Sequence, residues 1–121
     1  MPKWKNSNLL DKTGYSLNGL RCAFISEKAI RNESIGLFIM VLIAVARQTG
    51  LWTTTAVFIL CLLPITIELI NTSAEILIDM RLGPIFREEV KMIKDMLSAA
   101  VFLSLCIAYG LSFLLIFRPH I

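Results

Sequence analysis

The feature that most limits how this chain can fold is the run from Met96 to Phe117, 22 residues without a charged side chain. A helix needs about 20 mostly apolar residues to cross the hydrocarbon core of a bilayer, so this run predicts a transmembrane helix. Two further uncharged runs precede it, at Leu51–Ile67 and Ser34–Ala46. The shorter run reaches spanning length if its flanking residues Arg31 and Arg47 extend their charged ends to the membrane surface.

The overall composition agrees with a membrane protein. Hydrophobic residues make up 56% and charged residues 17% of the 121 residues, against about 45–50% and about 25% in a typical soluble domain. We therefore expect one membrane-integral, all-α domain over residues 1–121, with transmembrane helices at 31–48, 51–80 and 88–117.

The segment before the first apolar run has a different pattern. Between residues 9 and 24, apolar residues or threonine recur every third or fourth position, and polar or basic residues fall between them. This spacing is typical of an amphipathic helix. We expect residues 8–30 to form a helix that lies on the membrane surface.

The basic residues predict how the chain is oriented. The side that holds the N-terminal segment and the connection between the second and third spans carries ten lysines and arginines, and the other side carries two, Arg47 and Arg118. Basic residues concentrate on the cytoplasmic side, so we expect the N-terminus in the cytoplasm. The net charge of +3 is too small to indicate nucleic acid binding.

Polar residues continue the second apolar run without a helix-breaking residue. At 100° per residue, Glu68, Asn71, Glu75 and Asp79 share a helix face about 80° wide. Carboxylates beside lipid are costly unless they are paired or bound to metal. Oxygen ligands without histidine or cysteine suit Mg²⁺, which is normally shared with substrate phosphates. This pattern predicts a metal or polyanion site at the cytoplasmic surface of the membrane.

A second group of polar residues leads into the last span. Lys94 and Asp95 directly precede the apolar run, and a lysine here can neutralise phosphate charge. We interpret Lys91 and Arg87 as basic residues that anchor the cytoplasmic side. Glycine-rich nucleotide loops of the GxxxxGK(S/T) or GxGxxG type are absent from the sequence, so a nucleotide would be held by side chains and a carboxylate-bound metal.

Three ordered motifs resemble the prokaryotic membrane-integral diacylglycerol kinases, a group that includes undecaprenol kinases. The segment from Glu68 to Asp79 resembles the family signature E-x-x-N-S/T-S/A-x-E-x-x-x-D. Lys94-Asp95-Met-Leu-Ser98-Ala-Ala-Val resembles A-K-D-x-x-S/A-A/G-A-V. The segment from Gly14 to Arg21, followed by Glu27, resembles the family's surface helix with its acidic residue. The chain departs from the family at Phe86-Arg87-Glu88, where relatives often have a histidine.

The resemblance implies a homotrimeric bundle in the bacterial cytoplasmic (inner) membrane, with active sites shared between subunits. It implies transfer of the γ-phosphoryl group of ATP, with Mg²⁺, to the hydroxyl of diacylglycerol, which gives phosphatidic acid. Glu68 aligns with the catalytic base, and Glu27 and Glu75 align with the residues that hold the metal.

The remaining roles also come from the resemblance. The residues aligned with ATP contacts are Tyr15, Glu27, Glu75, Ile85, Phe86, Arg87, Lys94 and Asp95. The further polar residues of the active site are Asn71 and Asp79. The residues aligned with contacts to the lipid substrate are Arg21, Arg31, Glu33, Glu68 and Ser98.

Three alternatives remain open at this point. An undecaprenol kinase would use the same site on another lipid alcohol. A small proton-coupled transporter also uses membrane glutamates, but it needs a carboxylate near the middle of the bilayer, whereas Glu68, Glu75 and Asp79 lie at one edge. A membrane assembly factor without catalytic activity would not explain the carboxylate stripe.

Overall fold

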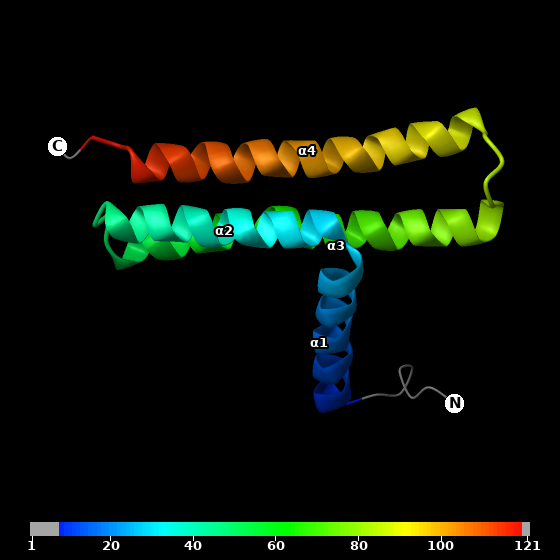
Figure 1. The fold of residues 1–121 in the computed structure, drawn as a ribbon, viewed down its shortest axis with the longest axis horizontal. Helices are drawn as coiled ribbons and strands as arrows, with labels where there is room; N and C mark the ends of the chain where they lie inside the picture. Colours follow the sequence, from blue (N-terminus) through cyan, green and yellow to red (C-terminus); the bar gives the residue numbers. More distant parts are fainter. Residues whose placement is uncertain (1–7, 120–121) are drawn as a thin grey trace.

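The computed structural model describes residues 8–119, and this part of the chain is entirely helical apart from short connections (Figure 1). The all-α class predicted from the sequence is confirmed. The four helices are α1 (Leu9–Ser26), α2 (Lys28–Ala46), α3 (Leu51–Leu82) and α4 (Glu88–Ile116).

The helices α2, α3 and α4 are each long and apolar enough to cross a membrane, which confirms the three predicted spans. They lie side by side along one common direction (Figure 1). Leu51, Trp52 and many of the apolar side chains farther along these helices are exposed, as lipid-facing residues are. The chain is a multi-pass membrane protein.

The first helix, α1, leaves this bundle at nearly a right angle (Figure 1). None of its residues is buried, and Leu9, Leu17 and Phe24 are largely exposed. A helix perpendicular to the spans runs parallel to the membrane plane. This direction and the exposed apolar residues fit the predicted surface helix.

The helix predicted over residues 8–30 is divided at Glu27, which has an extended backbone between α1 and α2. The guanidinium of Arg31 donates to the backbone carbonyls of Phe24 and Ile25, at 2.9 and 2.8 Å. These are among the last carbonyls of α1, which have no partner within the helix. Arg31 therefore fixes the corner at which the chain turns from the membrane surface into the first span.

The three spans differ in length, and this difference positions the polar residues. The 19 residues of α2 extend about 28 Å at 1.5 Å per residue, close to the roughly 30 Å of the hydrocarbon core. The 32 residues of α3 and the 29 of α4 are too long for the core alone. Since α2 and α3 are joined by a short turn, the surplus length extends past the start of α2 (Figure 1).

The buried apolar cluster of the bundle lies toward the opposite end. Ala44, Val57, Cys61 and Ile116 form a buried cluster drawn from all three spans. Beyond it, the guanidinium of Arg47 lies 4.4 Å from the centre of the Phe117 ring. This contact joins the turn after α2 to the end of α4.

Gly36 permits a close contact between α2 and α4, because a Cβ atom there would overlap the hydroxyl oxygen of Tyr109. Gly36→Ala is expected to destabilise the bundle by about 1–3 kcal/mol through overpacking, measured as unfolding in detergent micelles. The double variant Gly36→Ala/Tyr109→Phe removes the overlapping oxygen and should recover most of the loss. If Gly36→Ala is as stable as the unchanged protein, this contact does not limit the packing.

Candidate active site

Glu68 lies in α3 at the depth where the shorter span α2 begins. It comes 17 residues after Leu51, about 26 Å along the helix axis. Its side chain is only 7% exposed. A carboxylate at this position is close to the boundary between hydrocarbon and water.

Two neighbouring side chains hold one oxygen of Glu68. Asn71 Nδ2 donates to Oε1 at 3.4 Å, and Thr72 Oγ1 donates to the same oxygen at 3.5 Å. Both donors lie one turn further along α3, so the helix itself orients the carboxylate. Neither of them donates to Oε2, which leaves that oxygen able to accept a proton.

A second buried carboxylate, Glu33 of α2, lies near Glu68. Glu33 is 9% exposed, and the charges of Glu33 and Glu68 interact. Within residues 8–119, Oε2 of Glu33 and Oδ1 of Asn71 are buried without a hydrogen-bond partner. Unsatisfied buried oxygens are uncommon and costly, so this polar cluster is a candidate binding site at the membrane edge.

Further along α3, the polar face continues beyond the start of α2. Glu75 is partly buried and Asp79 is exposed. Asp79 Oδ1 accepts a hydrogen bond from Lys94 Nζ of α4 at 2.7 Å. This ion pair joins α3 to α4 outside the membrane core. It brings together two residues that the sequence predicted for the site but could not pair.

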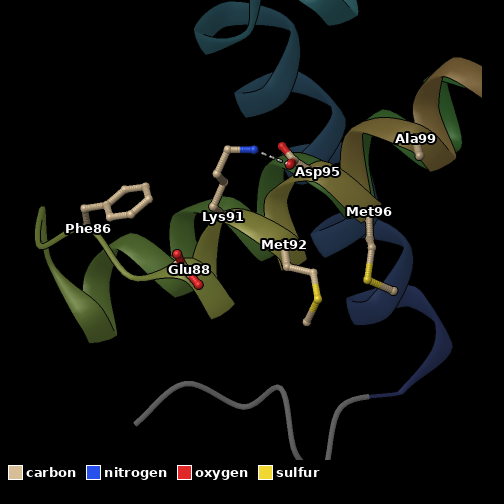
Figure 2. A pocket seen from close by; sticks show the side chains of 7 residues that line it. All are labelled: Phe86, Glu88, Lys91, Met92, Asp95, Met96 and Ala99. Atoms are coloured by element: carbon tan, nitrogen blue, oxygen red, sulfur yellow. Dashed lines mark hydrogen bonds and ion pairs between the residues drawn. The ribbon is translucent and has the colours of Figure 1, made fainter.

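On α4, the side chains of Lys91 and Asp95 form an ion pair of 2.6 Å across one helical turn. Figure 2 shows this pair in a pocket that is also lined by Phe86 of the preceding loop and by Met92 and Met96, whose side chains point away from the pair. The pair is largely exposed, at 62% and 64% for the two side chains. Exposed pairs contribute about 0–1 kcal/mol, so a competing charged ligand can separate them.

Several cavities border these groups. A groove of about 600 Å³ lies between α1 and α3 and reaches Thr72, the donor to Glu68. A cavity of about 360 Å³ lies under the connection between α3 and α4. The residues that line this cavity under the connection are Asp79, Gly83, Pro84, Ile85, Phe86, Arg87, Val90, Lys91, Lys94 and Asp95. The loop residues predicted to contact ATP thus share one cavity with Lys94 and Asp95.

The other predicted residues are distributed around this region. Tyr15 and Arg21 are exposed on α1, Glu27 is partly buried at the corner before α2, and Ser98 is exposed on α4. Within residues 8–119, no three His, Cys, Asp or Glu side chains are grouped closely enough to hold a metal ion by themselves. The described residues of the chain therefore do not supply a complete metal cage by themselves.

Two features of the site were not predicted from the sequence. The proximity of Glu33 to Glu68 depends on how α2 packs against α3, and no local pattern indicates it. Lys91, for which the sequence predicts only an anchoring role, lines the loop cavity. Lys91 and Asp95 are four residues apart in the sequence, a spacing that predicts an ion pair on one face of a helix.

The fold and the edge carboxylates define a small helical membrane protein with a candidate site at the membrane surface. The family model for prokaryotic diacylglycerol kinase matches residues 14–117. The chain is 31% identical to the diacylglycerol kinase of Escherichia coli strain K12 over 102 residues, which cover 84% of this chain and 83% of the relative.

Two other relatives give the same result. The chain is 34% identical to the diacylglycerol kinase of Haemophilus influenzae over 103 residues, which cover 84% of this chain and 85% of the relative. It is 38% identical to the diacylglycerol kinase of Helicobacter pylori strain 26695 over 107 residues, which cover 86% and 81%. The chain belongs to the prokaryotic diacylglycerol kinase family.

Proposed function

We propose that this protein transfers the γ-phosphoryl group of ATP to the primary hydroxyl of diacylglycerol, giving phosphatidic acid and ADP. The observation that carries the proposal is Glu68, a buried carboxylate at the depth of lipid headgroups with one oxygen not engaged by its neighbours Asn71 and Thr72. Family membership and the names of the relatives support the same reaction.

In this mechanism Glu68 is the general base. The lipid hydroxyl approaches through the groove between α1 and α3 and gives its proton to Oε2 of Glu68. The hydroxyl oxygen forms a bond to the γ-phosphorus as the bond to the bridging oxygen breaks, and ADP leaves with that electron pair. Phosphoryl transfer depends mainly on positioning and charge stabilisation, which Asn71 and Thr72 support by orienting the base.

The nucleotide would occupy the cytoplasmic side of the polar face. We assign Lys94 and Asp95, the loop residues 85–87 and Tyr15 to ATP binding. Lys94 stabilises negative charge on the transferring group, and Asp79 holds Lys94 in place through their 2.7 Å ion pair. On the lipid side we assign Arg21, Arg31, Glu33 and Ser98.

Magnesium is the metal that the donor set fits. Glu27 and Glu75 offer hard oxygen ligands, and Mg²⁺ is commonly bound by one or two carboxylates together with substrate phosphates and water. Such a site does not need three clustered protein ligands. When bound, Mg²⁺ would neutralise charge on the phosphates, and Glu27 and Glu75 would be the residues that hold it.

We further propose a homotrimer with the N-terminus in the cytoplasm of a bacterial inner membrane. Glu68 and Asn71 are buried within one chain, but Glu75 is only partly buried and Asp79 is exposed, and neighbouring subunits could complete this outer part of the site. Small residues on α4, such as Ala99, Ala100 and Gly110, would permit close contacts between subunits. Full activity in protein that runs as a monomer in a cross-linking assay would contradict this assembly.

The direct test of the function is transfer of ³²P from ATP into lipid by the purified protein. Diacylglycerol and undecaprenol are supplied in parallel in mixed micelles, with Mg²⁺. We expect labelled phosphatidic acid and a higher kcat/KM for diacylglycerol. A higher kcat/KM for undecaprenol favours the undecaprenol kinase alternative, and the absence of transfer to either lipid contradicts a lipid kinase.

The role of Glu68 can be tested with Glu68→Gln, which keeps the shape of the side chain but cannot accept the proton. Loss of a general base typically lowers kcat by about 10²- to 10⁴-fold, with little change in ATP affinity. The matched control is Glu89→Gln, because Glu89 is exposed on α4 and is expected to leave turnover unchanged. Substantial activity in Glu68→Gln would remove Glu68 as the base.

The metal ligands can be tested with Glu27→Gln and Glu75→Gln. Each is expected to raise the Mg²⁺ concentration needed for half-maximal turnover by at least about tenfold, since loss of even an outer partner of a metal site costs about that much. The measurement is a Mg²⁺ titration at fixed ATP, with Glu89→Gln as control. An unchanged Mg²⁺ requirement in both variants would show that these carboxylates do not hold the metal.

A further inference from the structure

The cavity under the connection between α3 and α4 has an excess of positive charge. Three basic side chains, Arg87, Lys91 and Lys94, line it together with two acidic ones, Asp79 and Asp95. The two ion pairs engage Lys94 with Asp79 and Lys91 with Asp95. Arg87 forms no ion pair with the described part of the chain. The side chains of this cavity therefore carry a net positive charge, which suits a negatively charged ligand.

Lys91 is the member of this group that the sequence analysis did not assign to the site. It lies one turn before Lys94 and Asp95 on the same side of α4, five residues ahead of the apolar run that starts at Met96. Its ammonium reaches Asp95 at 2.6 Å. Figure 2 draws a neighbouring pocket that Lys91 and Asp95 also line, and it shows the Lys91 side chain standing away from the helix toward Asp95. Asp95 lines the cavity under the connection as well, so the charged end of Lys91 lies beside a residue of that cavity wall.

The pairing of Lys91 is easily exchanged. Both partners are more than 60% exposed, and such a surface pair contributes little to stability. A phosphate chain carries more negative charge than a single carboxylate and accepts several hydrogen bonds. A lysine on a flexible stem can turn from Asp95 to such a ligand without movement of the helix.

We propose that Lys91 is a further nucleotide-binding residue, which leaves Asp95 and binds the phosphate chain of a nucleoside triphosphate in this cavity beside Lys94 and Arg87. The inference rests on the proposed function, because it extends the ATP site by one residue. The competing explanation is that Lys91 only stabilises α4 through its pair with Asp95. The two explanations differ in one respect. If Lys91 binds the phosphate chain, the loss of nucleotide affinity on replacing Lys91 depends on the number of phosphates in the ligand.

The experiment measures the affinity of the full-length protein for ATP, ADP and AMP with Mg²⁺ by isothermal titration calorimetry in detergent micelles, without lipid substrate. Lys91→Gln is expected to weaken ATP binding about tenfold, which corresponds to about 1.4 kcal/mol. The loss should be smaller for ADP and smallest for AMP. Lys91→Arg keeps the charge and should restore most of the affinity.

The matched control is Arg81→Gln. Arg81 is an exposed basic residue in the last turn of α3, near the same connection, but it does not line the cavity. Its replacement removes the same charge from the same side of the membrane. Because an exposed charge outside the cavity contributes little, ATP affinity should stay within about twofold of the unchanged protein.

Three results would overturn the inference: unchanged ATP affinity in Lys91→Gln, an equal loss for ATP and AMP, or an equal loss in Arg81→Gln. Failure of the proposed function is seen separately in the unchanged protein. If it binds ATP but transfers no phosphoryl group to lipid, the proposed reaction is wrong. The affinities for ATP, ADP and AMP then still test whether Lys91 binds the phosphate chain. If it binds no ATP, both proposals are wrong.

Discussion

The thickness of the bilayer is the constraint on which the rest of this structure depends. The span α2 is about as long as the hydrocarbon core, and it is tied by a short turn to α3, which is 13 residues longer (32 against 19). The end of α3 must therefore leave the membrane, and the lengths of the two helices predict that it leaves close to Glu68. Burying a carboxylate in hydrocarbon is costly, so the helix can carry Glu68 only where water and polar partners are within reach.

Two kinds of charged group follow from this geometry. At the membrane edge, Glu33 and Glu68 are almost fully buried, where the low dielectric strengthens electrostatic interactions and makes the carboxylates sensitive to a bound ligand. About 16 Å further along α3, Asp79 pairs with Lys94 in a more exposed setting. Buried groups suit proton transfer, and exposed pairs suit exchange with a charged nucleotide.

Much of the architecture could be predicted from the sequence because it depends on local patterns. The spans follow from uncharged runs, and the stripe from Glu68 to Asp79 follows from the 100° helical repeat. The corner at Glu27 could not be predicted, because it depends on Arg31 reaching back to carbonyls of α1. The pairing of Asp79 with Lys94 depends on the register of two packed helices, which hydropathy does not determine.

The most direct test of the central claim is the depth of α3 in the membrane. Spin labels at three similarly exposed positions, Ile59, Ile70 and Leu77, can be compared by their collision with oxygen and with a water-soluble nickel complex in lipid vesicles. We predict that the label lies in hydrocarbon at position 59, at the interface at position 70 and in water at position 77. A label at 77 that is as protected from nickel as the label at 59 would contradict it.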